Sequence, residues 1–100
     1  MIQPKMYNMK KQLDGAIAKY RDVLSNNPVL PDARFGLAEA LEDGPKDSVA
    51  TLSESAQQYQ VYLTLANDLT SKDREKLTDL IERLNDKVAK LKQKEDHDKM

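Results

Sequence analysis

One pattern of four-residue steps in the first half of this 100-residue chain constrains its fold more than any other feature. Ala16, Tyr20 and Leu24 recur at this spacing, so they share one face of a helix. Pro28 follows four residues later, and the helix must end before it because proline lacks a backbone N–H and disfavours helical dihedrals in the preceding residue. Pro31 then suits the first position of a new helix, where the missing N–H costs nothing. The pattern therefore predicts two helices joined by a tight connection.

Apolar residues recur at three- and four-residue steps along most of the chain, which is typical of amphipathic helices. This spacing predicts helices over four stretches, namely about residues 4–26, 31–42, 47–67 and 71–93. Residues 94–100 are charged and lack apolar periodicity, and we expect them to form a disordered tail. The predicted fold is therefore an all-α domain of four antiparallel helices over residues 1–93.

Local signals mark the ends of two of these helices. Asp47 or Ser48 is expected to cap the third helix, because short polar side chains accept hydrogen bonds from the first turn. Thr70 and Asp73 form a capping box at the start of the fourth helix, with Asp in the usual place of Glu. Inside the first helix, Gly15 costs about 1 kcal/mol of helix propensity relative to Ala. We therefore expect Gly15 to mark a place where another helix approaches closely.

The composition limits what this chain can be. Its apolar content of 39% and charged content of 33% are typical of one small, soluble, mostly helical domain, or of a piece of a larger helical array. A domain of this size buries roughly 60–65% of the surface that its unfolded chain exposes, so each long helix must contribute an apolar face. The absence of cysteine excludes disulfides and thiolate metal sites, and no apolar stretch reaches the ~20 residues of a membrane span. A cytoplasmic location is the default expectation.

Charge is unevenly distributed along the chain, although the net charge is only −1. Residues 25–70 carry two basic and seven acidic side chains, which gives this segment a net charge of about −5. Proteins that bind nucleic acid need a basic surface against the phosphate backbone. The acidic middle of the chain therefore argues against nucleic acid as the main partner.

No constellation of residues points to catalysis or to a bound cofactor. The single histidine, His97, lies in the charged tail between Asp96 and Asp98. No second histidine completes a metal site, and nothing positions His97 for a catalytic triad. We therefore expect a non-enzymatic protein with no metal and no cofactor.

An acidic cluster lies near the end of the second predicted helix and comprises Glu39, Glu42 and Asp43. Such clusters are usually solvated helix faces without a partner. The alternative is an acidic face that binds a ligand, and general acid–base catalysis is much less favoured than either.

The spacing of Ala16, Tyr20 and Pro28 resembles the tetratricopeptide repeat, a family of helical binding scaffolds. In that family a small residue lets paired helices approach closely, an aromatic residue follows four positions later, and a proline ends the unit. The small-then-aromatic spacing recurs about 39 residues later in the third predicted helix, a longer period than the family's usual value of about 34. The resemblance covers about residues 13–63 and implies a helical-repeat fold that the fourth helix closes.

A narrower resemblance is carried by three short stretches, Asn27-Pro28, Ala33-Arg34-Phe35-Gly36-x-Ala38 and Glu42-Asp43. They are similar to the helical-repeat region that precedes the catalytic domain in aspartyl/asparaginyl beta-hydroxylases. The iron chemistry of those enzymes needs two histidines and a partner acid in a β fold. The resemblance therefore implies a non-catalytic region, and it gives the lumen of the endoplasmic reticulum as an alternative location.

The tetratricopeptide resemblance implies a protein- or peptide-binding role. In that family the first helix of each pair lines a concave groove. Applied to the second predicted helix, the resemblance implies four groove-facing residues, namely Asp32, Phe35, Glu39 and Glu42. This surface is acidic around one aromatic side chain, so we expect a basic or basic-hydrophobic segment as the partner. The expected function is a binding scaffold, and a monomer is favoured over a homodimer.

A structural or oligomerisation role is the alternative. The fourth predicted helix carries an apolar stripe that could pair with a second copy of the chain in coiled-coil fashion, namely Leu77, Leu80, Leu84, Val88 and Leu91. The same stripe could instead cap the domain from within, and this use is favoured.

Overall fold

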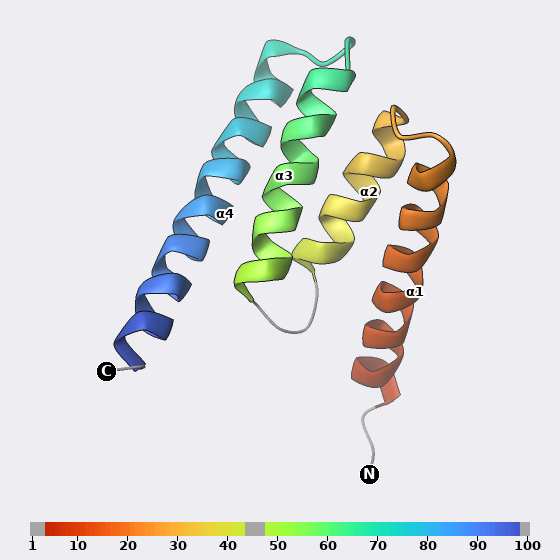
Figure 1. The fold of residues 1–100 in the computed structure, drawn as a ribbon. Helices are drawn as coiled ribbons and strands as arrows, with labels where there is room; N and C mark the ends of the chain where they lie inside the picture. The colour runs from red at the N-terminus through yellow and green to blue at the C-terminus, as the bar shows by residue number, and fades with distance from the viewer. Residues whose placement is uncertain (1–3, 44–47, 99–100) are drawn as a thin grey trace.

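The computed structural model describes residues 4–43 and 48–98, with side chains for residues 12–43 and 48–94. The described chain forms four helices: α1 (Pro4–Asn26), α2 (Pro31–Glu42), α3 (Val49–Leu65) and α4 (Ser71–Asp98). Consecutive helices run antiparallel and pack side by side, α1 on α2, α2 on α3 and α3 on α4 (Figure 1). The prediction of an all-α fold with four antiparallel helices is therefore confirmed.

The observed helix bounds differ from the predicted ones in the second half of the chain. α3 begins at Val49 and ends at Leu65, so it is shorter than the predicted helix over about residues 47–67. α4 continues to Asp98 rather than ending near residue 93, and so enters the segment predicted to be a disordered tail. This segment has no Gly or Pro, and its Lys and Glu residues are good helix formers, so nothing local stops the helix.

The predicted helix caps correspond to specific hydrogen bonds. Ser48 is the N-cap of α3, and its Oγ accepts a hydrogen bond of 3.1 Å from the backbone N–H of Thr51. The alternative cap, Asp47, lies outside the described residues. At the start of α4, the Thr70 hydroxyl accepts a hydrogen bond of 3.1 Å from the Asp73 N–H. Each bond satisfies a backbone donor that the first helical turn leaves without a partner.

α2 contributes to two separate apolar clusters, one on each side of it. The cluster toward α1 contains Leu24 of α1 and three residues of α2, Ala33, Leu37 and Leu41. The cluster toward α3 and α4 contains one buried residue of α2, together with residues of the two later helices: Ala38, Leu52, Ala56, Tyr59, Ile81, Leu84 and Val88. The short helix α2 therefore joins the two halves of the core.

Small residues bring α2 and α3 together. Ala38 of α2 and Ser55 of α3 are both 0% exposed, and the Ser55 hydroxyl donates a hydrogen bond of 2.8 Å to the Ala38 carbonyl. A buried hydroxyl without a partner would be costly, so this bond makes a polar residue acceptable at the contact.

Side chains also link α1 to α3 across one face of α2. Arg21 of α1 donates two hydrogen bonds to the Glu54 carboxylate of α3, at 2.6 and 2.9 Å. These bonds lower the pKa of Glu54. The pair is partly exposed and so contributes at most about 1 kcal/mol to stability, and its two hydrogen bonds link α1 directly to α3.

The close approach that we expected at Gly15 occurs instead at Gly36. A Cβ built on Gly15 would meet no atom within 4 Å, apart from its own helix and chain neighbours. A Cβ at Gly36 of α2 would overlap the phenol ring of Tyr20, which packs over this position from α1. The prediction failed because Gly15 lies on an exposed part of α1. The spacing of the apolar residues alone did not show which of the two glycines faces a neighbouring helix.

None of the helices in the described ranges has an apolar stretch long enough to cross a membrane.

The two glycines should respond in opposite ways to alanine. Gly15→Ala should raise the free energy of unfolding by about 0.5–1 kcal/mol, because it improves helix propensity without any clash. Gly36→Ala should lower it by about 1 kcal/mol, because displacement of the Tyr20 ring outweighs the same gain in propensity. Urea denaturation followed by circular dichroism measures both changes.

A double-mutant cycle checks that the Tyr20 ring is the cause. In a Tyr20→Ala background the clash is absent, so Gly36→Ala should become stabilising by about 1 kcal/mol. A destabilising effect of the same size in both backgrounds would contradict this explanation.

Candidate functional site

Helices α2 and α4 line two neighbouring hollows on the same side of α3, which together we call the α2–α4 groove. The first hollow, the apolar pocket, has a volume of about 280 Å³ and is lined by Phe35, Tyr62, Leu69, Asp73, Lys76 and Leu77. The second, the charged pocket, has a volume of about 300 Å³ and is lined by Glu42, Leu80, Arg83, Leu84, Asp86, Lys87 and Lys90. The groove is therefore apolar at one end and charged at the other.

Aromatic rings form the wall and floor of the apolar pocket. Phe35 of α2 meets Tyr59 of α3 edge to face, with ring centroids 5.6 Å apart and planes at 75°. It also contacts Tyr62, with centroids 5.0 Å apart. Tyr59 is 1% exposed and belongs to the core, so the rings of the pocket rest on a rigid base. Leu69, from the connection between α3 and α4, and Leu77 of α4 complete the apolar lining.

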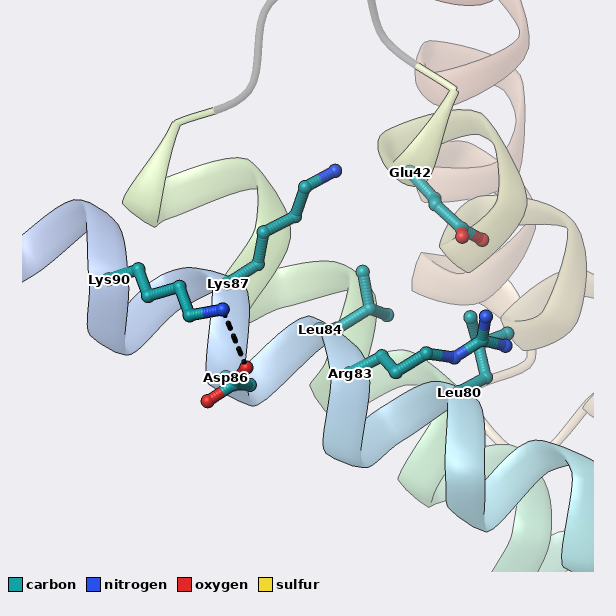
Figure 2. A pocket seen from close by; sticks show the side chains of 7 residues that line it. All are labelled: Glu42, Leu80, Arg83, Leu84, Asp86, Lys87 and Lys90. Carbon is teal, nitrogen blue, oxygen red and sulfur yellow. Dashed lines mark ion pairs between the residues drawn. The ribbon is translucent and has the colours of Figure 1, made fainter.

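The charged pocket has an acidic wall from α2 and a mostly basic wall from α4. Figure 2 shows the Glu42 carboxylate directed toward α4, with Arg83 and Lys87 on the α4 side of the same hollow. The Glu42 carboxylate also accepts a hydrogen bond of 2.7 Å from the Tyr59 hydroxyl. On α4, Lys90 forms an ion pair of 3.2 Å with Asp86.

Carboxylates crowd the end of α2 and disfavour each other's charge. Partial burial raises the pKa of Glu39, and the nearby negative charges of Asp43 and Glu42 raise it further. Burial, together with the hydrogen bond to Glu42, raises the pKa of Tyr59 as well, so its hydroxyl stays a neutral donor. The end of α2 is therefore a region of negative potential in which an added positive charge would be favourable.

The structure brings two of the four predicted binding residues into the groove. Phe35 lines the apolar pocket and Glu42 lines the charged pocket. Seven residues separate them on α2, which corresponds to about 10 Å along the helix axis. Asp32 and Glu39 are exposed on the same face of α2 but line neither hollow of the groove.

Sequence reasoning missed the opposite wall of the groove. Four exposed basic residues of α4 line the two pockets, namely Lys76, Arg83, Lys87 and Lys90. They recur at helical spacing beside the apolar stripe, and this pattern could have identified them as one face. Only the position of α4 opposite α2 shows that this face borders the groove.

The stripe considered for oligomerisation packs inside the chain. Leu84 and Val88 are buried in the cluster that α4 shares with α3, at 4% and 8% exposure. Leu77, Leu80 and Leu91 are half-buried and pack against the same cluster. The stripe therefore serves to attach α4 to the rest of the domain.

Within the part of the chain that the structure describes, no group of three or more His, Cys, Asp or Glu side chains is placed to hold a metal ion. The side chains of Asp96, His97 and Asp98 lie outside this part.

Comparison of this chain with models of known protein families, with curated protein sequences and with solved structures finds no match.

The raised pKa of Glu39 leads to a prediction about stability and pH. A carboxylate whose pKa is raised by folding opposes folding when it is ionised, and the penalty disappears once the pH falls below its pKa in both states. Glu39→Gln should therefore stabilise the chain at pH 7 by a few tenths of a kcal/mol, the scale of like-charge pairs on an exposed helix. Urea denaturation of both proteins over a pH series measures the difference.

The difference in stability between Glu39→Gln and wild type should shrink toward zero as the pH falls and Glu39 becomes protonated. A difference that is independent of pH would contradict the electrostatic origin and would indicate an effect of packing alone.

Proposed function

We propose that this chain is a non-catalytic protein- or peptide-binding module of the tetratricopeptide-like helical-repeat type, and that its ligand lies in the α2–α4 groove. The observation that carries the proposal is the groove itself, which consists of an apolar pocket and a charged pocket that are both lined by α2 and α4. Concave apolar sites with a few polar groups at their edges are the usual form of binding sites.

Details of helix packing support the repeat-type assignment. The resemblance implies a small residue where paired helices meet, with an aromatic residue four positions later. In α3 these are Ser55, which contacts Ala38 of α2, and Tyr59, which is buried beside Phe35. α2 and α3 form the one complete helix pair of the resemblance, and α4 covers α3 as a closing helix would.

The chemistry of α2 favours a basic-hydrophobic segment as ligand. An apolar side chain of the partner would enter the pocket beside Phe35 and Leu69. Glu39 lies outside both hollows but is exposed on the same face of α2, so a Lys or Arg at one end of the partner could approach it. The positive charge would offset the burial and the like-charge repulsion that raise the pKa of this carboxylate. Ion pairs of this kind affect the association rate and salt dependence more than the affinity, so the apolar contact should supply most of the binding energy.

The alternative role in oligomerisation has less support, because the stripe on which it depends is packed against α3. A dimer through this surface would require α4 to detach from the core. We therefore favour the binding role.

Peptides selected from a random library displayed on phage would test the proposal. Binders of the wild-type chain should lose affinity for Leu69→Ser, which makes the apolar pocket more polar but touches neither core cluster. Glu39→Lys should weaken the same binders by about three- to tenfold, the scale of one or two partly exposed ion pairs. Fluorescence anisotropy with labelled peptides measures both effects.

Two further choices make this test specific. Asp22→Lys adds the same charge on an exposed site of α1 and serves as the control, which should bind like wild type. Glu42 is left intact, because it accepts the hydrogen bond from Tyr59 and its replacement would also disturb the core. Binders that respond equally to Glu39→Lys and Asp22→Lys, and not at all to Leu69→Ser, would disprove the proposal.

A further inference from the structure

Most of the exposed charges of α4 lie in two stripes, and Asp73, Arg74 and Lys92 lie outside them. The basic stripe contains Lys76, Arg83, Lys87, Lys90 and Lys94, which lie within about 40° of a common line when the helix advances 100° per residue. The acidic stripe contains Glu75, Asp79, Glu82 and Asp86, and it is centred about 90° away around the helix. On an exposed helix whose charges serve only solubility, both signs are expected along each face, because opposite charges at i,i+4 stabilise the helix. Separate basic and acidic stripes are not expected there.

The basic stripe is the one that borders the groove. Lys76 lines the apolar pocket, and Arg83, Lys87 and Lys90 line the charged pocket. Asp79, Glu82 and Asp86 of the acidic stripe line a separate hollow with Arg83, and Asp86 also lines the charged pocket. The groove consequently has an acidic wall on α2 and a mostly basic wall on α4, where Asp73 and Asp86 are the acidic lining residues.

Arg83 occupies the centre of the basic wall. Within the described ranges it forms no hydrogen bond or ion pair, although Asp79 precedes it by one helical turn. Arg83 and Leu80 both line the charged pocket, and Figure 2 shows the Arg83 side chain extending away from α4. An exposed guanidinium is well suited to bind a carboxylate from outside, since it offers paired donors in a planar fork.

We infer that the ligand of the groove is a peptide segment with charges of both signs, and that its acidic side chain binds the basic stripe of α4 at Arg83 and Lys87. This inference rests on the proposed function. It adds that the ligand also carries a negative charge, and it states where on α4 that charge binds. A purely basic segment would satisfy Glu39 but would be repelled by the α4 wall. A purely acidic segment would be attracted by the α4 wall but repelled by the carboxylates of α2.

The geometry of the groove sets the spacing within this segment. Leu77 in the apolar pocket and Leu84 in the charged pocket are seven residues apart on α4, as Phe35 and Glu42 are on α2, which is about 10 Å in each case. An extended peptide covers this distance in about three residues. A helical peptide covers it in about seven residues. The acidic residue of the ligand should therefore lie about three or about seven positions from its large apolar residue.

Peptides selected for binding to the wild-type chain test this inference. Those that bind the Leu69→Ser variant more weakly than wild type are first identified as groove ligands. Their sequences should be enriched in an acidic residue at one of the two spacings. Each should bind the double variant Arg83→Gln/Lys87→Gln about three- to tenfold more weakly, the effect of two partly exposed ion pairs. Lys92→Gln removes a charge from the far side of α4, and this control should bind like wild type.

The outcomes separate this inference from the proposed function. Groove ligands that lack an acidic residue, or that bind the double variant and the Lys92→Gln control equally well, would overturn the inference and leave the binding function intact. A selection that yields no ligand sensitive to Leu69→Ser would overturn both. Enrichment of acidic residues together with a loss confined to Arg83→Gln/Lys87→Gln is the result expected.

Discussion

Helix α2 has only 12 residues with which to hold the two halves of the core together, and the rest of the structure depends on how closely its neighbours approach it. On one side, Gly36 leaves room for the Tyr20 ring of α1. On the other, Ala38 lets α3 come near enough for the Ser55 hydroxyl to reach a backbone carbonyl. Larger side chains at either position would push a neighbouring helix outward, and the faces of α2 would then no longer be covered on both sides.

The same close packing leaves the third face of α2 free to form the groove. Because α1 and α3 cover two faces of this helix, Phe35 and Glu42 project beside α3 on the side where α4 also packs. Glu42 belongs both to the groove and to the support of the core. Its carboxylate lines the charged pocket and also accepts the hydrogen bond of a core tyrosine, Tyr59. The position of the acidic wall is therefore determined by the core itself.

Much of the fold follows from signals that act over a few residues. Pro28 and Pro31 locate the connection between α1 and α2, and Ser48 and Thr70 mark the starts of later helices. Features that depend on how helices are rotated against each other could not be predicted in this way. The role of Gly36 rather than Gly15 is one example, because helix propensity is the same at both sites and only the tertiary position of Tyr20 distinguishes them.

The same distinction between local signals and helix packing applies to the candidate site. Phe35 and Glu42 could be assigned from the resemblance to the tetratricopeptide repeat, whereas Arg83 and Lys87 face them only because α4 packs beside α3. The two kinds of group should also act differently in binding. The aromatic floor is part of the core and is already ordered, so an apolar side chain would bind there at little cost in entropy. The basic side chains on the α4 wall are exposed and lose rotamer freedom when they pair, so their main effect should be to select and orient the partner.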